Sequence, residues 1–415
     1  MKFSAPRITI ALVAIFMLTT SAIGHAQSAQ AKTFKSAVDL VNQHSSLVVL
    51  ADSSSGASIA VWPAMQGRVL TSSADGPNGH NFGWIKEDLV VSGKLDPHMN
   101  TIGGEDRIWL GPEGGQFSIF FAQGTPFDLA HWYTPPAFDS QSFDVVGKTS
   151  KSVSFRKTLE LTNYSGTKFH VQIDRTIDLL TSAQVWEHVH LAPVAGVKVV
   201  GFQSNNKLTN LAPQAFSKST GLLSLWVLGQ FRSSPHAEII LPIRSGPVDK
   251  LGTPVTTDYF GAVPADRIHI GDNAVFLKAD ANYRSKMGLS QARSKGVLGS
   301  YDPDNHVLTV VQFSQPSTPA DYVNAAWKIQ EHPFKGDAAN CYNDGPPAPG
   351  KPQFGQLYEL ESSSPAVALA SHGTSHDSVE HVQRTMHFVG TAQQLDAIAK
   401  AALGVSLKDI PISKD

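Results

Sequence analysis

The spacing of apolar residues changes along the chain from a helical to a strand-like period. Residues 36–44 read SAVDLVNQH, which would place Val38 and Val41 on one face of a short helix beginning near Ser36. Later segments are short, rich in β-branched or aromatic residues, and bounded by Gly, Pro, Asn and Asp, which is typical of strands and turns. These strand candidates are residues 47–50, 58–62, 115–121, 168–173, 306–313 and 356–361.

Helical spacing returns only near the C-terminus. In residues 392–403, Leu395, Ile398, Ala402 and Leu403 would share one face, and Gly404 is placed to end the helix. Many successive strands without helices between them argue against a parallel sheet and favour an antiparallel sandwich. We therefore predict an all-β fold, a large antiparallel sandwich with one short N-terminal and one C-terminal helix.

The first residues have the three-part pattern of a secretory signal peptide. Lys2 and Arg7 precede the apolar run 8–18, and the small-residue site Gly24-His25-Ala26 follows. We predict a signal peptide at 1–26, a flexible leader at 27–34 and a single domain at 35–415. The mature protein is therefore expected to be periplasmic or secreted. No later stretch is long enough to predict a membrane span.

Composition excludes several classes of protein. The chain has 33 Lys and Arg residues against 35 Asp and Glu residues. It therefore lacks the excess of basic residues that is typical of proteins that bind nucleic acids, and we expect no nucleic-acid partner. Its single Cys, Cys341, can form neither an internal disulfide nor a multi-thiolate zinc site.

The densest mixture of polar, aromatic and glycine residues lies between residues 100 and 133. Carboxylates and Arg can bind sugar hydroxyls while Trp packs on the C–H face of a sugar ring, so this region predicts a sugar site. The alternative is a Gly-rich turn with a structural Glu–Arg ion pair. The candidate substrate-binding residues are Glu105, Asp106, Arg107, Trp109, Glu113 and Trp132, joined by Asn343 and Asp344 from a later polar turn.

A second candidate is the strand predicted at 356–361. Glu359 and Glu361 would lie on the same face of that strand. Two neighbouring carboxylates raise each other's proton affinity, which suits a general acid or base. The alternative is an edge strand that faces solvent.

A third candidate is the segment 186–190. As a strand it would place His188 and His190 on one face, a spacing that suits a metal. Two histidines alone are a weak metal signal, so we predict no metal or other cofactor and keep a divalent ion at this pair as the alternative. No phosphate-binding Gly loop ending in Lys-Ser/Thr and no Gly-x-Ser-x-Gly motif occurs.

Taken together, residues 67–73, 103–115, 342–346 and 358–366 resemble an uncharacterised family of exported bacterial proteins. That family is similar to the galactose mutarotase-like (aldose 1-epimerase-like) superfamily. The resemblance implies a large antiparallel β-supersandwich with a sugar-binding cleft on one concave sheet.

The resemblance also implies roles for single residues. In aldose 1-epimerases a Leu-Glu pair followed by Pro carries the general base, and Leu360-Glu361 with Pro365 is similar to it, so Glu361 would be the base and Glu359 its alternative. The His-Gly-Gly motif of the epimerases is absent here. The acid candidates that remain are His131, His188 and His190.

The leading hypothesis is an exported carbohydrate-active protein that acts on a mono- or oligosaccharide by general acid–base chemistry. Epimerisation, lyase-type elimination and glycoside cleavage all need such a pair of groups, and the sequence does not choose among them. The alternative is a carbohydrate-binding module that keeps the cleft without turnover. A structural protein of the cell envelope is a third class, for which the sequence shows no specific feature.

Overall fold

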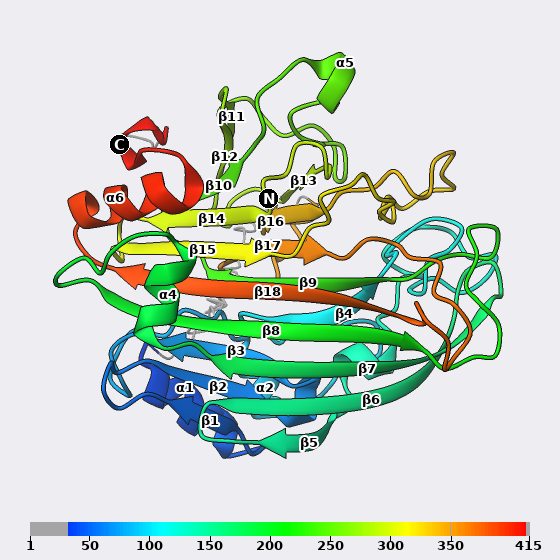
Figure 1. Cartoon of the computed structure of the whole chain (residues 1–415), viewed down its shortest axis with the longest axis horizontal. Coiled ribbons are helices and arrows are strands. Elements are labelled where there is room, and N and C mark those ends of the chain that lie inside the picture. Colours follow the sequence, from blue (N-terminus) through cyan, green and yellow to red (C-terminus); the bar gives the residue numbers. More distant parts are fainter. Residues whose placement is uncertain (1–31, 349, 412–415) are drawn as a thin grey trace, which may run out of the picture. The chain divides into compact units, whose positions relative to one another are not determined.

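A computed structural model describes residues 32–348 and 350–411, which are built mainly from antiparallel strands (Figure 1). The predicted signal peptide at 1–26 and most of the leader lie outside the described residues. The chain divides into two units, Met1–Gln30 and Ala31–Asp415, and all elements below belong to the second. Among the described residues, no helix combines the length and the apolar character that crossing a membrane requires.

The strands are β1 (Val48–Ala51), β2 (Ser58–Trp62), β3 (Arg68–Ser73), β4 (Arg107–Gly111), β5 (Asp144–Lys148), β6 (Ser152–Thr162), β7 (Lys168–Leu179), β8 (Lys198–Asn210), β9 (Ser224–Arg232), β10 (Glu238–Pro242), β11 (Ile268–Ile270), β12 (Ala274–Lys278), β13 (Ser285–Leu289), β14 (Val297–Asp302), β15 (Val307–Phe313), β16 (Ala339–Asn343), β17 (Leu357–Ser363) and β18 (Ser378–Val389). The helices are α1 (Phe34–Asn42), η1 (Pro63–Met65), α2 (Glu87–Ser92), α3 (Pro136–Asp139), α4 (Ser182–His188), α5 (Val248–Leu251), α6 (Ala392–Leu403) and η2 (Leu407–Asp409).

The strands form three sheets, and the pairs within them are antiparallel. The first has the order β1-β2-β3, the second β11-β12-β10-β14-β15-β18-β8-β7-β6-β5, and the third β13-β16-β17-β9-β4. Long strands form the middle of the ten-stranded sheet, where β18 pairs with β8 along its whole length. The prediction of an all-β antiparallel fold is confirmed.

The ten-stranded sheet packs one face on the five-stranded sheet and the other face on helices. Ile173 and Phe202 belong to the same core as Ile108 and Val227 of the five-stranded sheet. On the opposite face, α4 and α6 cover the sheet through a separate core that includes Trp186 (Figure 1). Each such large apolar side chain contributes about 1.5–3 kcal/mol when it is fully buried.

The two predicted terminal helices are present. The C-terminal helix α6 has the predicted bounds and ends at Gly404, which adopts a left-handed φ of 70°. The N-terminal helix α1 begins at Phe34, two residues before the predicted start, because the hydroxyl of Thr33 accepts the backbone N–H of Ser36 and caps the helix there. Phe34, the last residue of the leader predicted at 27–34, is buried and is the first residue of α1.

Two strand predictions are wrong. Residues 186–190 lie at the end of helix α4, which is initiated by a capping box between Thr181 and Gln184. Residues 115–121 form turns, because the Ser118 hydroxyl donates to the carbonyl of Glu113 and accepts the N–H of Phe120. Such local side-chain bonds offer the backbone an alternative to strand pairing.

Candidate functional site

A cleft lies on the face of the five-stranded sheet that is turned away from the ten-stranded sheet. Strand alternation decides which side chains reach it: in β4, Arg107 and Trp109 face the cleft, while Ile108 and Leu110 face the core. The cleft-facing side chains of the sheet are Arg107 and Trp109 of β4, Trp226, Leu228 and Gln230 of β9, Leu357, Glu359 and Glu361 of β17, Tyr342 of β16 and Lys286 of β13.

The strand register brings the polar members of this group side by side. Glu359 pairs with Tyr342 on one side and with Gln230 on the other, and Lys286 pairs with Tyr342 in turn. Directly paired residues in an antiparallel sheet have Cβ atoms about 5 Å apart, so side chains that are remote in sequence meet here.

Glu361 is the most enclosed carboxylate of the cleft. Its side chain is 1% exposed. Its Oε2 atom accepts the indole N–H of Trp226 at 2.9 Å and lies 3.2 Å from the Nζ atom of Lys286. Its Oε1 atom is buried and accepts no hydrogen bond from an N–H or hydroxyl group of the described residues. An unfilled buried acceptor is costly, which indicates a position that a ligand completes.

Glu359 lies two residues away on the same face of β17. Its Oε1 atom accepts from Arg107 at 2.9 Å and from Gln230 at 2.5 Å. Burial raises the pKa of Glu359 to about 7; Arg107 opposes this shift, whereas the charge of Glu361 and a hydrogen bond to it add to it. Near neutral pH, the carboxyl group of Glu359 therefore holds a proton for part of the time.

Lys286 lies between two carboxyl groups of the cleft. Its Nζ atom lies 3.2 Å from Glu361 and 3.9 Å from Oε2 of Glu113, which follows β4, the strand at the other edge of the sheet from Lys286. Burial lowers the pKa of Lys286, but the charges of Glu361 and Glu113 outweigh this and raise it overall, so the ammonium stays charged. Burial raises the pKa of Glu113, against the attraction of Lys286. Because both distances are measured to the same Nζ atom, the Oε2 atoms of the two carboxyl groups are at most about 7 Å apart.

Aromatic rings provide the apolar surface of the cleft. The ring of Trp109 packs edge-on against Trp226 at 5.6 Å between centroids and lies 6.1 Å from Trp132. The guanidinium of Arg107 lies 4.5 Å above the ring of Trp109. The Nε atom of Arg107 and the Nε1 atom of Trp132 are buried without hydrogen-bond partners. The cleft therefore combines flat apolar faces with unused donors, which suits a polar ring-shaped ligand.

Six of the residues predicted from sequence meet in this cleft, although two of them were assigned to catalysis and four to binding. They are Arg107, Trp109, Glu113, Trp132, Glu359 and Glu361.

Glu105 and Asp106 do not reach the cleft. They follow Gly103 and Gly104, whose φ angles of 106° and 110° turn the chain inward. Glu105 accepts from the Ser72 hydroxyl at 2.8 Å and contacts His387 at 2.9 Å, and its side chain is fully buried.

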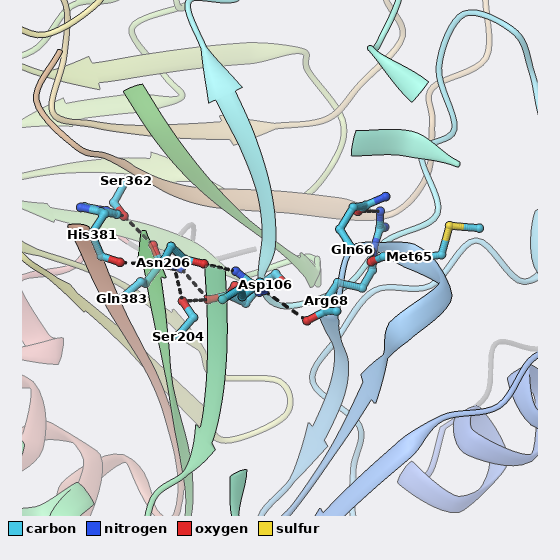
Figure 2. A network of polar contacts seen from close by, with 11 residues as sticks. Met65, Gln66, Arg68, Asp106, Ser204, Asn206, Ser362, His381 and Gln383 are labelled. Carbon is cyan, nitrogen blue, oxygen red and sulfur yellow. Dashed lines mark hydrogen bonds and ion pairs between the residues drawn. The ribbon is translucent and has the colours of Figure 1, made fainter. Parts of the chain in front are cut away.

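Asp106 forms a buried ion pair with Arg175 and belongs to a polar network between the sheets. Figure 2 shows this network running from Asp106 through Ser204 and Asn206 toward Gln383, His381 and Ser362. Asp106 therefore has its ion pair in the core, with Arg175, whereas Arg107 has its ion pair in the cleft, with Glu359.

Asn343 and Asp344 hold neighbouring loops and are fully buried. Asn343 accepts the N–H of Ala281 at 2.9 Å and donates to the carbonyl of Tyr283. Asp344 accepts the hydroxyl of Tyr342 at 2.6 Å and the N–H of Gly355. Their contact with the cleft is indirect, through the fixed position of Tyr342.

The histidines predicted as acids lie elsewhere. His131 is 41% exposed on a turn, where it contacts Asp128 at 2.6 Å. His188 ends helix α4 on the far face of the ten-stranded sheet, and its carbonyl accepts from Gln312. His190 lies beyond the end of that helix with a φ of 54°, so the strand spacing on which the metal alternative depended does not exist. In the part of the chain that the structure describes, no three His, Cys, Asp or Glu side chains gather as a metal site.

Sequence reasoning missed Lys286, Trp226 and Gln230. Trp226 and Gln230 had a usable signal, since the alternation of residues 224–232 places Trp226, Leu228 and Gln230 on one face. Lys286 had none, because its partners Glu361 and Glu113 come from other parts of the chain.

Comparison with known proteins gives one family and several solved structures. A family described as a family of unknown function, DUF6786, matches residues 32–413. No curated protein matches the sequence. Among solved structures, the chain is similar to the Slr1438 protein of Synechocystis sp. PCC 6803, with 13% identity, a TM-score of 0.48, and coverage of 83% of this chain and 96% of that one.

Two further structures carry informative names. A putative aldose 1-epimerase from Escherichia coli K12 has 11% identity and a TM-score of 0.48, over 82% of this chain and 98% of that one. A galactose mutarotase-like protein from Lactobacillus casei ATCC 334 has 12% identity and a TM-score of 0.44, over 83% and 99%. The structural neighbours are thus mutarotase-like and epimerase-like proteins of low sequence identity.

Proposed function

This chain belongs to DUF6786, a family of unknown function, and from the cleft we propose that it is a carbohydrate-active protein that acts on a sugar or glycan by general acid–base chemistry. One observation carries the proposal: Glu113, which follows β4, and Glu361 of β17 both lie beside the ammonium of Lys286 in an aromatic cleft. Paired carboxyl groups across such a gap are the usual machinery for proton transfer at a sugar.

Glu361 is assigned as the general base. Lys286 and Trp226 hold its Oε2 atom, while its Oε1 atom is left without a donor. That free oxygen is placed to take a proton from a sugar hydroxyl or from water. Glu359 is the alternative base, but Arg107 and Gln230 already occupy its Oε1 atom.

Glu113 is assigned as the general acid. Burial raises the pKa of its carboxyl group, which favours the protonated form that an acid needs. It would give its proton to the oxygen atom of the sugar bond that is broken. This role passes to Glu113 from His131 and His188, which do not line the cleft around Glu361.

A carbohydrate-binding module without turnover is the second candidate. It is favoured by the sequence before Gly103-Gly104, where Asn100-Thr101-Ile102 stands in place of a histidine. The same cleft would then hold a sugar through its Trp rings and Arg107. For either function we place the protein outside the cytoplasm, on the basis of Lys2, Arg7 and the apolar run that follows them.

The test begins with a binding and turnover screen of monosaccharides and glycans, run with and without chelator. With a substrate found, Glu361→Gln should lower turnover by about 10²–10⁴-fold and keep binding, because the amide preserves shape but cannot accept the proton. Glu113→Gln should act in the same way. Glu160→Gln, on the exposed face of β6, is the matched control.

Unchanged turnover in Glu361→Gln would show that Glu361 is not the general base. Binding without turnover in the wild-type protein, on every sugar that binds, would select the binding module instead.

A further inference from the structure

The cleft is the narrow middle part of a longer groove. The cavity around Glu359 and Glu361 has a volume of about 90 Å³. A cavity of about 380 Å³ adjoins it on one side and shares Glu113, Phe260 and Lys286 with it. A third cavity, of about 530 Å³, adjoins it on the other side and shares Met99, Thr101, Trp132 and Phe354. We call the cavity of about 380 Å³ the first flank and the cavity of about 530 Å³ the second flank.

From this shape we propose that the ligand is an oligosaccharide that crosses the groove, with sugar units in both flanks and a linkage at the carboxyl groups. The inference rests on the proposed function. Each flank falls in the roughly 300–1,000 Å³ range of small-molecule sites, whereas the middle is far smaller. A single sugar unit would leave at least one flank empty.

Both flanks have linings that suit sugars. The first flank combines the aromatic rings of Tyr259 and Trp327 with the polar groups of Asp258, Lys328 and Asp337. Aromatic faces and exposed polar groups together match the two kinds of surface that a pyranose presents.

The second flank has the same mixture. It is lined by Leu129 and Phe354 together with Asp88, Lys94 and His98. Leu129 is 50% exposed, so an apolar side chain faces this flank without a partner that covers it fully.

An aromatic contact also joins the linings of the two flanks. The rings of Trp132 and Trp327 stack with their centroids 6.0 Å apart. Trp327 lines the first flank and Trp132 lines the middle and the second flank. The two cavities on either side of the middle are therefore connected through one pair of contacting aromatic rings.

The position of the ionisable groups points to the bond that is affected. Glu359 and Glu361 line only the middle cavity, and Glu113 and Lys286 lie at its boundary with the first flank. With sugar units on both sides, these groups face a linkage inside the chain rather than the free anomeric hydroxyl of a monosaccharide.

The experiment measures affinity against chain length by calorimetry. The probes are β-1,4-linked glucose, α-1,4-linked glucose and α-1,4-linked galacturonate, each from one to six units, followed by a glycan array. In a series that binds, the Kd should fall by about tenfold or more from one unit to six.

Flank variants supply the structural control. Two variants test the flanks, Asp258→Ala in the first and Leu129→Ser in the second. Each should reduce the gain in affinity from one unit to six about three- to tenfold, because each removes a contact that only the longer ligand makes. The matched controls are Asp144→Ala and Val146→Ser on the exposed strand β5, which should keep the full gain.

Equal affinity for one unit and for six would overturn the proposal that an oligosaccharide crosses the groove, but it would not contradict the proposed function. Failure to bind any sugar, on the array or in the three series, would overturn the proposed function and this inference with it.

Discussion

The proton held by Glu359 couples the cleft to the stability of the fold. The pKa of Glu359 is raised by burial from 4.5 to about 7, so between these values the folded chain holds a proton that the unfolded chain has released. The stabilising contribution of this group is therefore complete below pH 4.5 and is lost as the pH rises through 7.

This loss of stability with rising pH gives a prediction for Glu359→Gln, whose amide does not ionise. Relative to the wild type, the variant should become more stable as the pH rises from 5 to 8, by on the order of 1–3 kcal/mol. The measurement is the free energy of unfolding of both proteins by urea at several pH values. Glu380→Gln, at an exposed position of β18, controls for the substitution itself. A difference that falls with rising pH would contradict the assignment.

At the level of residues, sequence could identify those whose chemistry shows in a local pattern. Glu359 and Glu361 were found because alternation places them on one face of β17. Glu105 looked equivalent to Glu113 in the same Gly-rich segment, but the positive φ angles at Gly103 and Gly104 send it to Ser72 and His387. No local rule states which way two consecutive glycines turn a chain.

At the level of single elements, helix α6 shows the strongest agreement between pattern and structure. Its bounds follow from a complete set of local signals: a capping box at Thr391 and Gln394, an apolar face, and Gly404 at the end. Helix α4 also has a capping box, but it is only seven residues long. So short a segment does not show enough of its period to be told from a strand.

The apolar face of α6 supports a prediction of stability. Ile398 is fully buried in the core between α6 and the ten-stranded sheet. Ile398→Ala should lower the free energy of unfolding by about 2–5 kcal/mol, because it leaves a cavity there. Lys400→Ala, which removes only an exposed pair with Asp396, should cost no more than about 0.5 kcal/mol. Similar losses for both variants, measured by urea unfolding, would show that α6 is not packed as described.

At the level of the whole molecule, one buried arginine joins parts of all three sheets. Arg175 of β7 donates to the carbonyl of Gly67, which precedes β3, at 3.2 Å. It also donates to Asn206 of β8 at 2.6 Å and pairs with Asp106, directly before β4. Both charged side chains of this pair are completely buried.

Removing one partner of such a pair leaves an uncompensated charge in the core. Arg175→Met should therefore lower the free energy of unfolding by about 3–5 kcal/mol, and adding Asp106→Asn should recover part of the loss. Arg156→Met breaks an exposed pair with Asp174 in the same sheet and should cost no more than about 1 kcal/mol. If the double variant were less stable than Arg175→Met, the uncompensated charge would not be the cause.

The fold class could be predicted from sequence, whereas the arrangement of the sheets could not. Alternation reports that a residue faces one side of a strand, but not which strand lies beside it. In the five-stranded sheet, β9 lies between β4 and β17, so residues 107–111, 224–232 and 357–363 are neighbours. In the same sheet β16 lies between β13 and β17, and this order brings Lys286 of β13 to Glu361 of β17. Because the order is not encoded in any local pattern, the pair could not be predicted from the sequence.

This strand order also has a consequence for how the protein is made. Translation proceeds at about 5–20 residues per second, so β4 is made several seconds before β9, the strand with which it pairs. During that time β4 has an unpaired edge and exposes Ile108 and Leu110, the kind of surface on which nascent chains associate. The yield of folded protein will therefore depend on how this early segment is shielded during synthesis, independently of the final stability.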